Sequence, residues 1–139
     1  MHEFNFKRKP MVKICGKEYE FDPSNNDLLK GIVENYPQIL HIAMDFQKMQ
    51  RELTAGKVDY QNLLEKNKDL LTACKGFIIG CLGESEYNEI FSQRKPNSTE
   101  HVELCTFLYQ SMMEDREDVL KEYLGDENEN DSVETSDQT

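Results

Sequence analysis

The segment from Lys75 to Asn97 constrains the fold most, because an apolar run, a glycine and a second short apolar pattern follow one another closely. Its first part has apolar residues at spacings of 3 and 4, as on one face of a helix: Phe77, Ile78, Cys81 and Leu82. Gly83 is expected to end this helix, since glycine readily adopts the left-handed backbone found just past helix ends. Ser85 is expected to cap a next helix with Tyr87, Ile90 and Phe91 on one face. The segment therefore predicts two helices folded onto each other at a tight turn.

The same segment contains the pattern F-I-x-x-x-L-G, followed by I-F and then R-x-P. The residues that carry it are Phe77, Ile78, Leu82, Gly83, Ile90, Phe91, Arg94 and Pro96. This pattern is similar to that of the small tail assembly chaperones of long-tailed (siphovirus-type) phages and prophages. Its residues are packing and turn residues, and no catalytic signature is among them.

The net charge restricts the classes of partner. The chain has 139 residues and a formal net charge of −11. Such an acidic balance argues against binding of nucleic acid and against docking on anionic membranes, because both would repel it. The N-terminus lacks the continuous apolar run of a secretory signal, and the longest apolar run is far shorter than the ~20 residues of a membrane span. We therefore expect a cytoplasmic protein that binds neither nucleic acid nor membrane.

Strand signals are confined to about residues 3–21. Apolar and polar residues alternate in three short runs, around Phe4 and Phe6, Val12 and Ile14, and Tyr19 and Phe21. Gly16 and Lys17 can form a two-residue turn with glycine in its first position. This predicts an N-terminal β-hairpin that leans on the helices or on another subunit, because two strands alone are marginally stable.

Helical periodicity covers most of the remaining chain to residue 124. A first helix is expected from the turn residues at 22–27 to Thr54, with a kink or break near Asn35 because Pro37 follows. A second is expected at 59–82, with Leu64 among its inward residues, and Gly76 and Gly80 would permit close approach of another helix. After the short helix that follows Gly83, a fourth is expected at 98–124 with Asn97 as its cap.

The last residues have a different composition. Residues 126–139 contain six acidic side chains and no basic one, so they cannot bury enough apolar surface to offset chain entropy. The predicted fold is therefore mainly α: a small bundle of about four helices with an N-terminal β-hairpin and a disordered acidic C-terminal tail. Residues 1–124 form the single domain, and residues 125–139 form the tail.

Candidate catalytic and metal-binding groups are sparse. His41 and Asp45 are four residues apart on a helix, as are His101 and Cys105, and the second spacing is permissible for metal ligands. No nucleophile accompanies the first pair, and Leu104 and Leu108 around the second favour a core position. The four cysteines show no CxxC spacing and are expected to be reduced residues of a cytosolic core. We expect no catalytic residue, metal or cofactor.

The chaperone resemblance implies a function. In that family the protein binds the long tape measure protein and keeps it soluble until tail tube subunits polymerise around it, and it is absent from the mature virion. A longer product, often made by translational frameshifting, adds a domain that recruits the tail tube protein. The residues expected to form a groove for the helical tape measure protein are Ile39, Phe46, Met49, Tyr109 and Met112. Methionine is flexible enough for such a surface, but Met44, Met49, Met112 and Met113 also fit simple core filling.

Two alternatives remain open from the residues. The chain can be a self-associating structural or regulatory helical adaptor of a phage, such as a connector or interaction module, and a homo-oligomer fits this interpretation. An enzyme would have to use His41 with Asp45, or a metal held by His101 and Cys105, and stoichiometric zinc in purified protein would favour it.

Overall fold

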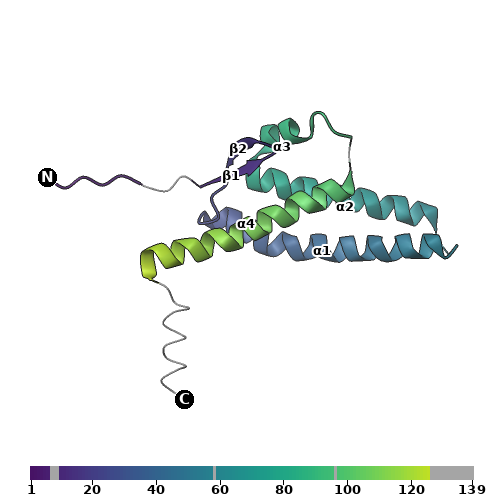
Figure 1. Ribbon diagram of the computed structural model, residues 1–139. Coiled ribbons are helices and arrows are strands. Elements are labelled where there is room, and N and C mark those ends of the chain that lie inside the picture. The colour runs from purple at the N-terminus through teal and green to yellow at the C-terminus, as the bar shows by residue number, and fades with distance from the viewer. Residues whose placement is uncertain (7–9, 58, 96, 126–139) are drawn as a thin grey trace, which may run out of the picture.

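The computed structural model describes residues 1–6, 10–57, 59–95 and 97–125, and its elements are a β-hairpin and helices (Figure 1). In chain order they are β1 (Met11–Ile14), β2 (Lys17–Glu20), α1 (Asn26–Thr54), α2 (Tyr60–Leu82), α3 (Glu84–Phe91) and α4 (Ser98–Leu124). The predicted fold class, a mainly helical chain with an N-terminal hairpin, is confirmed. The predicted tail lies outside the described residues apart from Gly125.

The turn of the β-hairpin lies one residue earlier in the sequence than predicted. β1 and β2 pair antiparallel with Ile14 opposite Lys17, so Cys15 and Gly16 are the two turn residues. Both have positive φ, 51° and 86°, as in a type I′ turn, whose twist matches that of the flanking strands. The predicted Gly16–Lys17 turn is therefore wrong, because glycine occupies the second turn position. Phe4 and Phe6 also form no strand among the described residues; they are exposed and contact each other edge to face.

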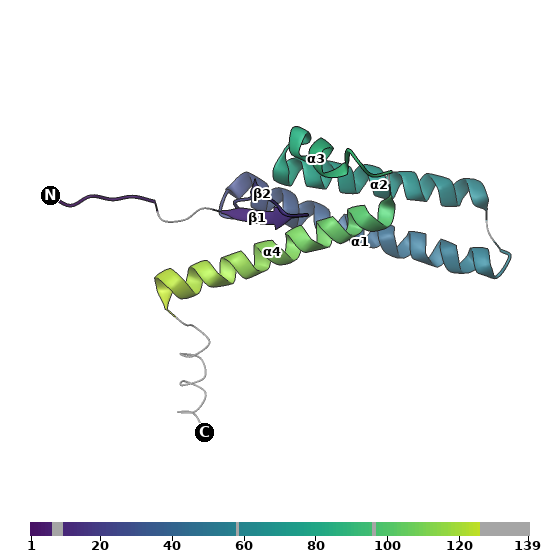
Figure 2. The ribbon, with the colours of Figure 1, turned by 45° about the horizontal axis from the view of Figure 1, so that its top comes forward.

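α1 is one continuous helix of 29 residues. Asn25 caps it, accepting hydrogen bonds from the backbone N–H groups of Asp27 and Leu28 at 2.9 and 3.2 Å. The predicted break before Pro37 does not occur: the proline removes one backbone donor, but the helix runs through it to Thr54 as expected. α1 packs along α2 (Figure 2).

α2 and α3 meet at Gly83, which ends one helix and begins the next. Its N–H donates to the carbonyl of Ile79 at 2.8 Å, and its carbonyl accepts from the N–H of Tyr87 at 3.0 Å. α3 therefore starts at Glu84, and Ser85, which was expected to be its cap, lies inside the helix. Gly83 has φ 109°, a backbone conformation that favours glycine.

The core lies where the hairpin, α1, α2 and α4 meet. Its buried apolar residues are Val12, Ile14, Tyr19, Phe21, Ile32, Tyr36, Ile39, Leu70, Cys74, Phe77, Ile78, Cys81, Leu104, Cys105, Leu108 and Met112. The beginning of α2 is less covered, and Leu64 is 64% exposed, so its predicted inward position is wrong. Gly76 and Gly80 have open space beside them, so the described residues show no close helix contact there.

α4 spans the length that its sequence predicts. Asn97 caps it by accepting from the N–H of Glu100 at 3.1 Å, and Gly125, at φ 86°, follows its last residue. Its first half packs against α2 and α1, whereas its second half extends beyond the start of α1 (Figures 1 and 2). The exposed Leu120, Tyr123 and Leu124 belong to this second half.

Candidate binding groove between α1 and α4

An apolar groove runs between the first half of α1 and the middle of α4. Its volume is about 550 Å³. The residues that line it are Leu29, Val33, Tyr36, Pro37, Leu40, Tyr109, Met112, Met113 and Arg116. Val33, Leu40 and Met113 are 55%, 41% and 53% exposed, so apolar side chains are open to solvent along both walls. A concave, mainly apolar surface of this size suits the apolar side chains of a helix or an extended segment.

Aromatic stacking fixes the floor of the groove. The rings of Tyr36 and Tyr109 stack with centroids 4.2 Å apart and an interplanar angle of 7°. The hydroxyl of Tyr36 donates to Oγ1 of Thr106 at 3.2 Å, which satisfies a phenol that is otherwise almost buried. Met112, 2% exposed, packs below the walls. The two helices are thus held together at the groove, and a ligand would meet a preformed surface.

Pro37 lies within α1 and lines the groove together with Val33. Proline has no backbone N–H, so it cannot donate the helical hydrogen bond that another residue would make to the carbonyl one turn earlier.

The outer face of α1 combines exposed apolar residues with positive charge. Val33, Leu40 and Met44 fall along one line of the helix, and Met44 is 68% exposed. Three exposed basic residues lie within about 60° of this line: Lys30, Lys48 and Arg51. The carboxylates of α1 lie about 100° or more from it. This face therefore favours an apolar partner segment with acidic residues beside its apolar stripe.

The residues predicted to form the protein-binding groove are only partly brought together. Tyr109 and Met112 line the groove. Ile39, at 1% exposed, is a core residue about 100° around the axis of α1 from Leu40, so it cannot contact a partner in this structure. Phe46 and Met49 are half-buried farther along α1 and do not line the groove.

Sequence reasoning missed the exposed walls because it assigned the stronger apolar stripe of each helix to binding. That stripe is the core stripe. A signal for the walls does exist in the sequence: Val33, Leu40 and Met44 repeat at spacings of 7 and 4, outside the core stripe. On α4, Met113 likewise lies outside the core stripe, directly after the core residue Met112.

The residues of the chaperone-like pattern form the corner between α2 and α3 and its contacts with α4. Phe77 and Ile78 are buried, and Leu82, Ile90 and Phe91 pack partly buried against the core. Gly83 makes the turn, and Arg94 forms an ion pair with Glu100. Pro96 lies outside the described residues. Those residues of the pattern that the structure describes thus have packing and turn positions.

His101 is a buried structural residue at this corner. Its Nδ1 lies 2.7 Å from the carbonyl oxygen of Asn97, so this nitrogen must carry the proton, and Nε2 then accepts from the hydroxyl of Tyr87 at 2.6 Å. The ring of Phe91 stacks on the imidazole with centroids 4.1 Å apart. Both ring nitrogens are engaged by protein groups, which leaves neither for a metal.

The cysteines do not form a reactive centre among the described residues. Cys74, Cys81 and Cys105 are buried, and burial raises the pKa of the Cys81 thiol to about 12. The hydrogen bond between the Cys74 and Cys105 thiols raises the pKa of Cys105, as burial also does, and lowers the pKa of Cys74, whose side chain has no exposed surface. Protonated, buried thiols are poor nucleophiles and poor metal ligands. Cys15 is exposed, against the expectation of a core position.

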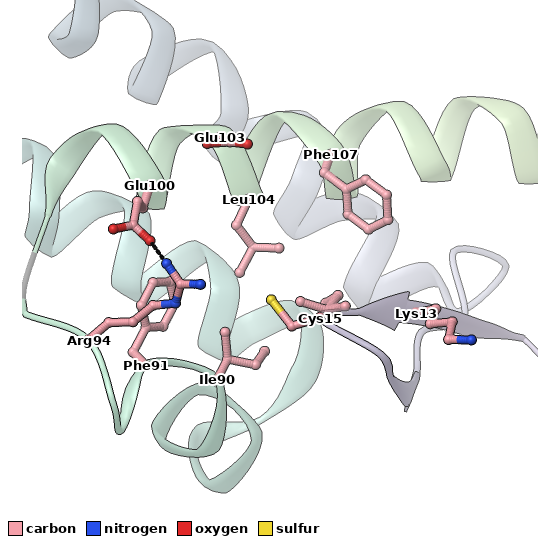
Figure 3. Close-up of a pocket in the computed structure, with 10 residues that line it drawn as sticks. Lys13, Cys15, Ile90, Phe91, Arg94, Glu100, Glu103, Leu104 and Phe107 are labelled. Carbon is pink, nitrogen blue, oxygen red and sulfur yellow. Dashed lines mark hydrogen bonds and ion pairs between the residues drawn. The ribbon is translucent and has the colours of Figure 1, made fainter.

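A smaller hollow of about 320 Å³ lies between the hairpin turn, α3 and α4 (Figure 3). Ile90, Leu104 and Phe107 give it an apolar interior, and the ion pair between Arg94 and Glu100 lies at its rim. The thiol of Cys15 points into it in Figure 3. None of the ten lining residues is a histidine that could activate this thiol, so the hollow has no arrangement for nucleophilic catalysis.

Other candidate sites are not assembled. His41 Nε2 lies 3.7 Å from a carboxylate oxygen of Asp45, and both side chains are largely exposed. Within the described ranges, no group of three or more His, Cys, Asp or Glu side chains could hold a metal ion. Nor does the described part of the chain include a helix long and apolar enough to cross a membrane.

Comparison with known protein families, with curated proteins and with solved structures finds no match to this chain. The features of the chain that indicate a function are therefore the groove itself and the pattern at the α2–α3 corner.

Proposed function

We propose that the protein is a tail assembly chaperone of a long-tailed phage or prophage, which binds helical segments of the tape measure protein in the α1–α4 groove. The observation that carries this proposal is the preformed apolar groove, with exposed walls made by Val33, Leu40 and Met113. The chaperone-like pattern at the α2–α3 corner supports the choice of family, because its described residues have the packing and turn positions that such a pattern needs.

The physical mechanism is coverage of apolar helical surface. An isolated tape measure protein, long and helical, exposes apolar stripes that would aggregate. A helix laid in the groove would bury its stripe against both walls, while the net charge of −11 on this chain would keep the complex dispersed. We place this activity in the host cytoplasm, with no catalytic step, and recruitment of tail tube subunits falls to a longer frameshifted product.

The test is co-expression of the chain with the tape measure protein of the same phage or prophage, followed by a solubility assay and pull-down. Leu40→Glu and Met113→Glu put a charge on each exposed wall and should return the tape measure protein to the insoluble fraction. Leu64→Glu is the matched control, because Leu64 is also an exposed apolar residue but lies on α2, away from the groove. Circular dichroism verifies that all three variants fold. If the wild-type chain leaves the tape measure protein insoluble, the proposed function is wrong.

The self-associating adaptor is the second candidate. The observation that favours it is the apolar end of α4, where Leu120, Tyr123 and Leu124 are exposed. A stable oligomer retained in purified phage particles would support the adaptor over the chaperone.

A further inference from the structure

The outer face of α1 has a local charge opposite to that of the whole chain. We call it the basic face, and its exposed members are Lys30, Val33, Leu40, Met44, Lys48 and Arg51. Lys30 and Lys48 each precede a glutamate by four residues, an order that favours a pair less than the reverse order does. Among the described residues, no ion pair involves the three bases of this face. Their charges are therefore available to an acidic partner.

α4 leads into an acidic segment of the same chain, residues 126–139. These fourteen residues contain six carboxylates and no base, and Val133 is their single aliphatic residue. The segment therefore has little apolar surface to bury, and attraction between opposite charges is what can hold it on a protein surface.

The nearer surface of α4 does not suit this segment. From Met113 to Leu124, α4 has five carboxylates and two bases, and one of these bases, Lys121, already lies 3.2 Å from Glu117. The second half of α4 therefore repels residues 126–139. The basic face of α1 has no carboxylate within about 100° of its apolar line, so the attraction there is not cancelled.

The end of α4 brings this segment within reach of the basic face. Leu29 and Arg116 line the same groove, so they lie at the same level of the bundle. The end of α4 extends beyond the start of α1 (Figures 1 and 2), and Gly125 is nine residues, about 13 Å, past Arg116. Lys48 lies about 27 Å farther along α1 than Lys30, which puts it about 40 Å from Gly125. Fourteen extended residues span about 46 Å, enough to reach both lysines.

We infer that residues 126–139 bind the basic face of α1 in the same chain, lying along the open side of the α1–α4 groove. Their carboxylates pair with Lys30, Lys48 and Arg51, and the segment lies over the exposed walls made by Val33 and Leu40. A ligand of the groove must displace it. The inference concerns the chain by itself and does not depend on the proposed function.

The first test is crosslinking of the full chain with a carbodiimide, which joins a lysine to a carboxylate only where the two are in direct contact. Mass spectrometry of the monomer should find residues 126–139 joined to Lys30 and Lys48. Lys68 is the internal control: it is exposed on α2, and the ion pair of its neighbour Lys66 with Asp45 places it between Lys30 and Lys48 along the bundle. Crosslinks to Lys68 should be rare, although it is no farther from Gly125 than Lys48 is.

Salt dependence checks that charge holds the segment. Raising the salt from about 0.1 M to about 1 M shortens the Debye length from ~10 to ~3 Å. The yield of crosslinks to Lys30 and Lys48 should then fall at least about fivefold, because these exposed pairs are strongly screened. A yield that does not change with salt would contradict an electrostatic contact.

The second test compares two full-length variants of equal net charge by NMR. The face variant neutralises the basic face with Lys30→Gln, Lys48→Gln and Arg51→Gln. The control variant neutralises three exposed lysines elsewhere, with Lys13→Gln, Lys68→Gln and Lys95→Gln. At low salt the amide resonances of residues 126–139 should move in the face variant to the positions that the wild-type chain shows at high salt. In the control variant they should remain at the low-salt positions of the wild type.

The following results would overturn the inference. Crosslinks that join the segment to Lys68 as often as to Lys30, or mainly to Lys7 and Lys9, would show that the basic face is not its binding site. Crosslinks found only between two chains would refute binding within one chain. Equal movement of the resonances in both variants would reflect the net charge alone and would refute a specific face.

Discussion

Two pairs of adjacent residues provide a sharp test of where the core ends and the groove begins. Ile39 and Leu40 follow each other on α1, yet they are 1% and 41% exposed. Met112 and Met113 on α4 are 2% and 53% exposed. Truncation to alanine should therefore destabilise the fold strongly at the first residue of each pair and weakly at the second.

The magnitude follows from burial. Ile39→Ala removes three carbon groups from a fully packed site, a loss of about 2.4 kcal/mol of transfer free energy at ~0.8 kcal/mol per group. The cavity that remains adds to this, for a total of roughly 3–4 kcal/mol. Leu40→Ala removes groups that are already in contact with water over a large part of their surface, and it leaves no enclosed cavity. Its cost should be about 1 kcal/mol or less.

The assay is urea unfolding followed by circular dichroism, at a protein concentration low enough to keep the chain monomeric. With a slope of about 2 kcal/mol per molar urea, Ile39→Ala should lower the unfolding midpoint by ~1.5–2 M and Leu40→Ala by ~0.5 M or less. Met112→Ala and Met113→Ala should differ in the same direction. Equal losses within a pair would mean that its two residues are equally buried, and the groove as described would not exist.

Three further substitutions test the corner and the hairpin. Tyr87→Phe removes the donor to Nε2 of His101 and should cost about 1–3 kcal/mol in thermal unfolding, because the buried nitrogen loses its partner. The hydrogen bond from Lys17 in the hairpin, together with its charge, lowers the pKa of Glu89 below its usual 4.5. The ionised carboxylate therefore stabilises the fold above pH 4.5, and this contribution is lost as the pH falls through the lowered pKa. The difference in melting temperature between wild type and Glu89→Gln should therefore shrink below pH 4.5, and a constant difference would contradict it. Gly83→Ala should destabilise by about 1 kcal/mol because of its positive φ, whereas Gly80→Ala, in open helix, should stabilise by ~0.5–1 kcal/mol.

Local signals in the sequence predicted most element boundaries. Asn25, Asp59 and Asn97 each cap a helix by accepting backbone hydrogen bonds, and glycines follow or end the helices where expected. These signals act within a few residues, so one sequence is enough to identify them. The start of α3 was mispredicted because Gly83 serves both neighbouring helices, which leaves Ser85 no position as a cap.

Burial was harder to predict, because it depends on which elements reach each other in space. The apolar stripe of α4 is continuous in sequence, but only its first half meets α1 and α2, so Met112 is buried and Leu120 is exposed. The stripe of α2 likewise extends to Leu64, which nothing covers. Periodicity identifies an apolar face, and the length of the neighbouring helices decides how much of that face becomes core. The walls of the groove could be identified only after this distinction.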